Sequence, residues 1–400
     1  MRNLSRELVA LGHDVEVFSG QPYPDLDPGV TLTKLPSLDL YREPDPFRTP
    51  RPREFRDWID VLEVLQMYTA AFPEPLTFSL RVARALRARA NDFDVIHDNQ
   101  TLGYGMLALL RSGPPLVTTI HHPITFDRRL EMAAARGWRK VTTWRWYGFT
   151  TMQGRVARRM PSIITVSESS RSDISREFTV DPSRIRTIPL GVAPIMLDRP
   201  AGARVPGRIV AMASADTPIK GIPTLLRAVA RLRHQQRRLE LVIVSKPRPG
   251  GPTERLVSEL GLGQTVRFVD SLSGPDLADL LGSAEIACVP SLYEGFSLPT
   301  VEAMARATPL VVSRAGAIPE VVGPAGECAL IVQPGDEVAL ADAISILLDD
   351  PTRRARMGAA GLDRAVERFS WQTVAEETVR AYREAIGSPR TVQKGRHDHN

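Results

Sequence analysis

Two glutamates eight positions apart are the residues of this sequence whose types and spacing best suit chemistry. Glu294 and Glu302 lie in VPSLYEGFSLPTVEAMA (289–305), with Gly295 directly after the first acid and Pro299 between the two. Within one continuous helix they would be about 12 Å apart along the axis. Proline is poorly tolerated inside a helix but suits its first turn. We therefore expect Glu294 on a loop and Glu302 on the first turn of the following helix, an arrangement typical of a ligand site.

The segments that must position these acids alternate between short apolar runs and amphipathic runs, a pattern typical of doubly wound parallel sheets. Strand-like runs are expected at 14–19, 30–35, 93–97, 115–121, 162–167, 208–214, 239–245, 265–270, 284–290, 309–313 and 328–333. Such sheets bind ligands at the carboxyl ends of their strands. The expected fold class is therefore α/β, with two doubly wound Rossmann-like domains that face a cleft.

The predicted organisation is two domains followed by a C-terminal extension. Its parts are an N-terminal domain at 1–190, a linker rich in Pro, Gly and Ala at 191–207, a second domain at 208–370, a helix at 371–387 and a disordered tail at 388–400. The Pro- and Arg-rich stretch 36–58 is expected to be a long surface loop. The first domain is assigned to the acceptor and the second to the donor on the resemblance described below.

The sequence opens directly with an amphipathic run, whereas a doubly wound domain normally opens with a strand and a Gly-rich turn. Residues 2–12, RNLSRELVALG, form a helix-like run with Gly12 at its C-terminal cap position. We therefore expect the N-terminal domain to lack its first strand. We also expect the chain to start late, at a start codon inside the first helix.

Composition excludes several classes of protein. The chain has 400 residues, of which 43% are hydrophobic, and none of its apolar runs reaches the roughly 18 residues that a membrane span needs. Its first residues carry charges throughout and lack the apolar core of a signal peptide. Cys288 and Cys328 each lie in an apolar run, which argues against a disulfide framework or a metal cluster. We therefore expect a cytoplasmic protein.

The net charge of +5 reflects many arginines, which are scattered among acids on helix-like segments. No nucleic-acid motif accompanies them, so no nucleic-acid partner is expected. The run 136–160 mixes Trp146 and other aromatic residues with Arg145 and further basic residues. A helix of that composition can lie on an anionic membrane, so peripheral contact with the inner face of a membrane is one prediction. Packing of these rings in the domain's own core is the alternative, and the oligomeric state is not predicted.

The segment EGFSLPTVEAMA resembles the signature of two glutamates separated by seven residues in the retaining glycosyltransferases of family 4 (bacterial group 1 type), which have the GT-B fold. Other stretches similar to the family occur along the chain in the expected order. They are ELVALGHDVEVFS, FDVIHDNQ, ITVSESSRSDI, IPLGVAP, IKGIPTLLRAVARL, AGAIPEVVG and LIVQPGDEVALADAISILLDDP. The similarity runs from Met1 to about Tyr382. It implies a nucleoside-diphosphate sugar as donor substrate, with neither cofactor nor metal.

The resemblance also implies roles for the two acids. Glu302 would accept hydrogen bonds from the ribose hydroxyls, and Glu294 would contact the transferred sugar. The intervening backbone would approach the diphosphate at a helix N-terminus, whose N–H groups favour anions; this loop consists of Gly295, Phe296, Ser297 and Leu298. Gly295 would allow close backbone approach. The alternative is that both acids merely cap a helix.

Lys220, in TPIKG, matches the family lysine that clamps the diphosphate and stabilises the departing nucleoside diphosphate. Such a cation replaces a metal because the leaving-group charge must be stabilised as it develops. The family pattern has an arginine five residues earlier, where this chain has Ala215. Lys246 and Arg248, after the next strand, are candidates for the second cation.

Histidines follow two strands of the N-terminal half. His121, in TTIHHPITFD, matches a family histidine that faces the donor sugar and acceptor, and its alternative is a packed residue at the domain interface. His97 is expected to be a structural residue at a strand end. Glu320 is either structural or close to the donor. Ser167 or Ser169 is expected to cap a helix.

These features predict a retaining, metal-independent glycosyltransferase. It would move a hexose from a nucleoside-diphosphate sugar to the hydroxyl of a sugar or lipid-linked acceptor, in a glycolipid, a polysaccharide or a small molecule. Two alternatives are a sugar-nucleotide epimerase and a non-catalytic sugar-nucleotide-binding protein. Ala215 and the absent first strand favour the binding protein.

Overall fold

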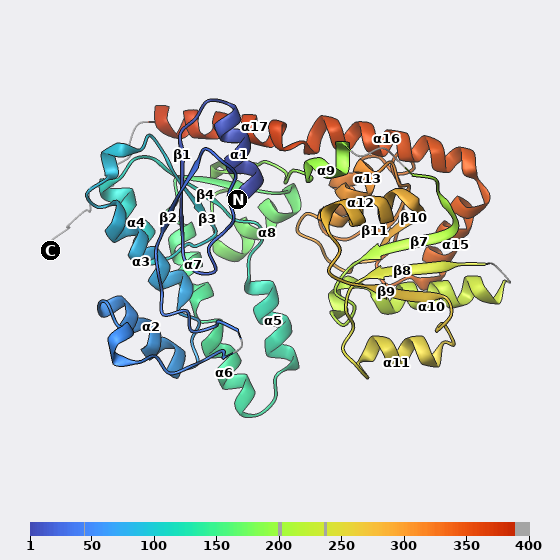
Figure 1. Ribbon diagram of the computed structural model, residues 1–400, viewed down its shortest axis with the longest axis horizontal. Helices are drawn as coiled ribbons and strands as arrows, with labels where there is room; N and C mark the ends of the chain where they lie inside the picture. The colour runs from blue at the N-terminus through green and yellow to red at the C-terminus, as the bar shows by residue number, and fades with distance from the viewer. Residues whose placement is uncertain (44, 199–201, 236–237, 389–400) are drawn as a thin grey trace, which may run out of the picture.

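Two α/β domains lie next to each other in the computed structural model, which describes residues 1–43, 45–198, 202–235 and 238–388 (Figure 1). Parallel sheets in both domains give the GT-B architecture expected from the sequence. Within these residues no helix has the length and apolar character needed to cross a membrane.

The strands of the N-terminal domain fall into two parallel sheets. One sheet pairs β1 (Val15–Ser19) with β2 (Val30–Lys34). The other has the order β3 (Ile96–Asn99), β4 (Leu116–Thr119), β5 (Ser162–Thr165), β6 (Ile185–Thr187). No strand among the described residues pairs with both β1 and β3.

Helices surround these sheets, and they bury a core that includes Leu102, Ile120, Val156 and Ile163. They are α1 (Arg2–Ala10), α2 (Trp58–Tyr68), α3 (Glu74–Leu86), α4 (Tyr104–Ser112), α5 (Thr125–Ala134), α6 (Trp138–Trp146), α7 (Phe149–Ala157) and α8 (Glu168–Phe178). Gly12 follows α1 with a φ of +87°, as its predicted place after the helix requires. The stretch predicted as a loop, 36–58, contains the 3₁₀ turn Pro52–Glu54 and ends at the first residue of α2.

The described residues of the C-terminal domain form one six-stranded parallel sheet. Its order is β12 (Ala329–Val332), β11 (Leu310–Ser313), β10 (Ala284–Val289), β7 (Val205–Met212), β8 (Glu240–Val244), β9 (Val266–Val269). Successive residues of a strand point to opposite faces. Val210 accordingly joins one core cluster, while Ile209 and Ala211 join another. Both faces of the sheet are therefore buried, as in a doubly wound fold.

Seven helices follow or cover these strands: α9 (Pro194–Asp198), α10 (Ile222–His234), α11 (Pro252–Glu259), α12 (Gly274–Ser283), α13 (Leu298–Ala305), α14 (Ile318–Val322) and α15 (Glu337–Asp349). The predicted linker 191–207 is partly regular, because α9 lies within it and β7 begins at Val205. Residues 199–201 of this segment lie outside the described residues, as do 389–400 of the predicted tail.

Two long helices connect the domains on one side of the molecule (Figure 1). The first, α16 (Pro351–Phe369), packs on α13 of the C-terminal domain. The second, α17 (Trp371–Gly387), returns to the N-terminal domain, where it contacts α1 and β4. It has the bounds expected for the C-terminal helix, and Ser370 caps it by accepting a hydrogen bond from the Thr373 amide.

Candidate functional site

A lysine and a glutamate meet at the carboxyl ends of two neighbouring strands. Lys220 lies on the 3₁₀ turn Pro218–Lys220 after β7, and Glu294 lies on the loop after β10. Lys220 Nζ donates to Glu294 Oε1 at 2.8 Å, and Ser291 Oγ donates to the same oxygen at 2.8 Å. Glu294 and Ser291 are both buried. The structure therefore joins two predicted site residues in one charge pair and adds Ser291, which the sequence interpretation missed.

Two glycines allow the backbone to pack tightly around this pair. Gly316 has a φ of +52°, and a Cβ atom there would lie 2.1 Å from the carbonyl oxygen of Glu294. Gly221 has a φ of +67°, and a Cβ atom there would lie 1.9 Å from the carbonyl oxygen of Pro290. At Gly295, by contrast, the closest atom to a Cβ would be Ser170 Oγ at 3.4 Å, an ordinary contact. The packing therefore requires glycine at positions 221 and 316, but not at position 295.

Glu302 lies on α13, in its second turn rather than the first turn that was predicted. The prediction was wrong because Leu298 begins the helix, one residue before Pro299. Burial raises the pKa of the Glu302 carboxyl to about 7. None of the described residues donates a hydrogen bond to it or forms an ion pair with it. An acceptor of this kind is suited to hydroxyl donors from a ligand.

The loop between the two acids divides into packing residues and contact residues. Phe296 is buried and meets Phe369 edge to face at 5.8 Å, so its ring belongs to the core. Ser297 precedes α13 with a φ of +85°, and its Oγ lies 2.7 Å from Thr300 Oγ1. Its side chain therefore caps no backbone amide at the start of α13. Leu298 is exposed.

The same loop contacts the N-terminal domain directly. Its Gly295 carbonyl accepts hydrogen bonds from Ser167 Oγ at 2.6 Å and Ser170 Oγ at 3.0 Å. Tyr293 stacks on Phe126 with ring centroids 5.0 Å apart. Ser167 is also the N-cap of α8, one of the two serines predicted for that role. The loop that carries Glu294 is therefore held by both domains.

Glu320 forms a second contact between the domains. Its two carboxylate oxygens accept hydrogen bonds from the backbone amides of Glu168 at 2.7 Å and Ser169 at 2.8 Å. These amides belong to the first turn of α8, where a negative charge is favourable. Of the two predicted roles, the contacts of Glu320 match the structural one.

His121 follows β4 and lies beside the loop of Glu294. A Cβ atom at Gly295 would lie 3.7 Å from the carbonyl oxygen of His121. The His121 ring Nε2 is 3.0 Å from Asn99 Oδ1. Burial, followed by the neighbouring His122, lowers the pKa of His121 to about 4. The imidazole is therefore neutral at pH 7, and with Asn99 Oδ1 as acceptor, Nε2 carries the proton.

His97 has different surroundings. Its ring nitrogens lie 2.6 Å from Tyr382 Oη on α17 and 2.6 Å from Thr119 Oγ1 on β4. Burial lowers the pKa of His97 to about 4. Both nitrogens thus bind the protein itself, in agreement with a structural role.

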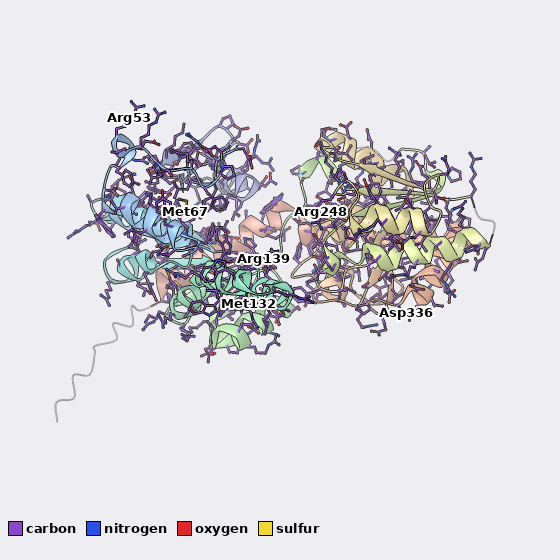
Figure 2. The ribbon with its side chains drawn as sticks, turned by 90° about the horizontal axis from the view of Figure 1, so that it is seen from below. Arg53, Met67, Met132, Arg139, Arg248 and Asp336 are labelled. Atoms are coloured by element: carbon purple, nitrogen blue, oxygen red, sulfur yellow. The ribbon has the colours of Figure 1, made fainter. Side chains whose placement is uncertain are left out.

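The two candidate second cations are exposed residues of the segment after β8. Ala215, at the family's arginine position, is buried, and its amide donates to Ser245 Oγ at 2.9 Å. The neighbouring Asp216 accepts a hydrogen bond from the Arg248 amide at 2.7 Å, and its carboxylate lies 3.5 Å from the guanidinium. Lys246 Nζ is 3.9 Å from Asp270. Arg248 therefore lies nearer the position of Ala215, on the side of its domain that faces the N-terminal domain (Figure 2).

The basic and aromatic run 136–160 is divided between core and surface. Trp146 packs against Phe72 at 5.1 Å and Tyr41 at 6.0 Å between ring centroids. Trp138 and Trp144 of α6 are exposed. The structure therefore places Trp146, the residue proposed for membrane contact, in an aromatic cluster.

Known proteins resemble both halves of the chain. A family model described as Glycosyltransferase Family 4 matches residues 1–194, and one described as Glycosyl transferases group 1 matches residues 206–350. The MMP α-(1→4)-mannosyltransferase of Mycolicibacterium hassiacum is 59% identical over 96% of this chain and 94% of its own length.

Solved structures share the fold. Sucrose-phosphate synthase of Thermosynechococcus elongatus has a TM-score of 0.67 at 24% identity, over 96% of this chain and 92% of its own. Anabaena HepE, in complex with UDP and glucose, has a TM-score of 0.66 at 17% identity, over 95% of each chain. Together with the family models and the mannosyltransferase relative, they show that the chain is a glycosyltransferase of family 4, of the group 1 type, with the GT-B fold.

Proposed function

We propose that the chain is a retaining, metal-independent mannosyltransferase that uses a nucleoside-diphosphate mannose. The observation that carries this proposal is the Lys220–Glu294 pair, with the unpartnered Glu302 on the helix that follows the same loop. The choice of mannose, and of a sugar 4-hydroxyl as acceptor, is supported by the name of the relative that is 59% identical.

The contacts of the pair suggest how the donor is received. Lys220 Nζ and Glu294 Oε1 form a charged hydrogen bond of 2.8 Å with each other. The donor would exchange this contact for two new ones, its diphosphate on Lys220 and its sugar hydroxyls on Glu294. Glu302 would accept from the ribose hydroxyls. Ser291 would keep Glu294 oriented while Lys220 turns to the phosphate.

In the reaction, the bond between the sugar's anomeric carbon and the diphosphate oxygen breaks, and a bond from the acceptor oxygen to that carbon forms on the same face. The acceptor's proton passes to the departing phosphate oxygen, so the chain needs no dedicated base. Lys220 stabilises the negative charge that develops on the leaving group. His121, neutral at pH 7, can hydrogen-bond the transferred sugar.

A non-catalytic sugar-nucleotide-binding protein is the second candidate, because buried Ala215 supplies no guanidinium to the diphosphate. A thermal-shift series across nucleoside-diphosphate sugars, followed by turnover with mannoside acceptors, separates the candidates. We expect the largest shift with a mannose donor, and product formed together with free nucleoside diphosphate. Tight binding without transfer or donor hydrolysis would favour the binding protein, and conversion of the donor sugar without acceptor would favour an epimerase.

A double substitution tests the second cation. We expect Lys246→Ala with Arg248→Ala to weaken donor binding by about 10-fold, the effect of losing a charge-assisted contact at an exposed position. Isothermal titration with the donor measures it, and each single variant shows which side chain contributes. Unchanged donor affinity and turnover in the double variant would remove both residues from the site.

Glu302→Gln tests the proposed contact between Glu302 and the ribose hydroxyls, because the charge of this carboxyl depends on pH. The folded pKa of about 7 lies above the ordinary 4.5, so the folded chain keeps a proton that the unfolded chain loses between these values. The contribution of the Glu302 carboxyl to the stability of the folded chain is therefore present at low pH and is lost as the pH rises through 7. We expect the Tm of the variant, relative to the parent, to be higher by a few degrees at about pH 8.5 than at about pH 5.5.

The same variant should bind the donor about 10- to 100-fold more weakly above pH 7, because a charged acceptor is lost. The parent's donor affinity should rise with pH around 7, and the variant's should not. An identical pH profile for the two proteins would separate Glu302 from the donor site. Peripheral membrane contact and a cytoplasmic location stay predictions.

A further inference from the structure

Helix α2 directs its charged residues inward. Asp60 and Glu63, its two acids, are buried against Arg81 of α3, which is also buried. Arg81 Nη2 donates to Asp60 Oδ1 at 2.7 Å and also to Glu63. A surface helix normally buries its apolar stripe and exposes its charges. In α2 this ion cluster shares the buried face with Ile59 and Met67, while large apolar side chains lie on the outer face, where charges are normal.

The outer face of α2 is correspondingly apolar. Its large exposed side chains are between 46% and 61% exposed, and they are Trp58, Val61, Leu65 and Tyr68. Their spacing of three, four and three residues is that of the a and d positions of a coiled coil, which form one narrow line along a helix. The sequence of α2 contains neither lysine nor arginine. This apolar line is therefore shaped to receive another helix.

Further exposed apolar residues extend the surface. Arg145 Nη2 at the end of α6 donates to Thr69 Oγ1 at the end of α2 at 3.2 Å, so the two helices meet there. Both lie on the underside of the N-terminal domain, where Met67 marks α2 and Arg139 marks α6 (Figure 2). The exposed large apolar side chains of α6 are Trp138, Val141 and Trp144, and Phe47 is exposed on the segment before α2.

The area of this surface is large enough for a stable contact. The eight exposed side chains include five aromatic rings, each more than half exposed. At about 200 Å² for a full aromatic side chain, the rings alone offer roughly 600 Å². With the aliphatic residues, the total approaches the roughly 800 Å² that each partner contributes to a standard interface. Monomers rarely leave a patch of this size uncovered.

We propose that a second copy of this chain covers α2, with the two α2 helices packed antiparallel across a two-fold axis. A two-fold interface uses the same patch on both subunits, so a self-complementary apolar line suffices. Antiparallel packing sets Trp58 near the partner's Tyr68 and Val61 near the partner's Leu65. It also opposes the two helix dipoles favourably. The residues of the proposed donor site lie outside this surface.

Charge argues against an anionic bilayer as the occupant of α2. Helices that lie on such membranes carry lysine and arginine on their polar face. The polar face of α2 is acidic and buried, and its outer face has no basic side chain. The basic residues of the region belong to α6, at the edge of the proposed interface.

Sedimentation velocity of the full chain over a micromolar concentration series tests the dimer, with Leu65→Glu as the disrupting variant. We expect the parent to be a dimer and the variant to raise the dimer Kd at least about 100-fold, because each of the two carboxylates would be buried in an apolar contact without a partner for its charge. Ile346→Glu, at a similarly exposed apolar residue of α15, is the matched control and should remain dimeric. Circular dichroism should be the same for all three proteins.

Crosslinking through Leu65→Cys provides a second readout, and this substitution places no charge in the contact. Cys288 and Cys328 are buried, so Leu65→Cys introduces the single exposed thiol among the described residues. A bismaleimide should join two Leu65→Cys chains and leave Ile346→Cys chains separate. A monomeric parent, or a dimer that Leu65→Glu leaves intact, would overturn the proposal. So would binding of the parent to anionic phosphatidylglycerol vesicles that Leu65→Glu abolishes.

Discussion

Replacement of Lys220 by methionine should lower kcat by about 10²- to 10³-fold, the cost of removing one preorganised group that stabilises developing charge. Methionine keeps much of the length of lysine without its charge. The leaving diphosphate would lose its cation, and Glu294 would lose the Lys220 Nζ that donates to its Oε1 at 2.8 Å. Steady-state kinetics with saturating donor and acceptor measure this effect.

Two further variants separate charge from fold. Lys34→Met removes a lysine that lies over the ring of Tyr23, far along the chain from the site, and should leave kcat unchanged. Lys220→Arg keeps the charge and should recover part of the lost rate. If Lys220→Met retained parental kcat with an unchanged Tm, the lysine would play no part in leaving-group stabilisation.

Gly316→Ala should lower kcat by about 10²-fold, although the residue itself touches no substrate. Its added Cβ would lie 2.1 Å from the Glu294 carbonyl oxygen, so the loop of Glu294 must shift. A displacement of about 1 Å in a positioned group can cost 10²-fold in rate. The Ala317 amide, which donates to that carbonyl at 2.9 Å, would shift with it.

Gly326→Ala is the matched control for this substitution. Gly326 also has a positive φ, +87°, but no atom lies within 4 Å of its added Cβ. Both variants therefore carry the cost of about 1–2 kcal/mol for a left-handed alanine, and Gly316→Ala alone carries the clash. Comparison of their kcat and Tm values separates backbone strain from displacement of Glu294. Equal kcat in the two variants would show that the loop tolerates the shift.

Most strands could be predicted because strands buried on both faces read as nearly continuous apolar runs. Every predicted run overlaps one of the observed strands, for example 239–245 with β8. The missed strand, β6, has three residues and carries Arg186, whose side chain reaches Glu384 on α17. So short and polar a run gives no periodic pattern, and only pairing with β5 makes it a strand.

The site could be predicted only in part. Glu294 was identified from its spacing to Glu302, and Lys220 through family resemblance, but they are 74 residues apart, and their contact depends on the neighbouring positions of β7 and β10. Gly316 and Ser291 were missed because their importance comes from distances to Glu294 that no spacing in the sequence encodes. The burial of the two acids of α2 could not be predicted for the same reason, because it depends on their contact with Arg81 on α3.

The central claim is that Lys220, Glu294 and Glu302 hold a nucleoside-diphosphate sugar for transfer with retention and without a metal. Its most direct test is the anomeric configuration of the product, determined by NMR after incubation with an α-linked nucleoside-diphosphate mannose, a mannoside acceptor and excess EDTA. The account predicts an α-linked mannoside formed at the same rate with and without EDTA. A β-linked product, or a rate that EDTA abolishes and added divalent metal restores, would contradict it.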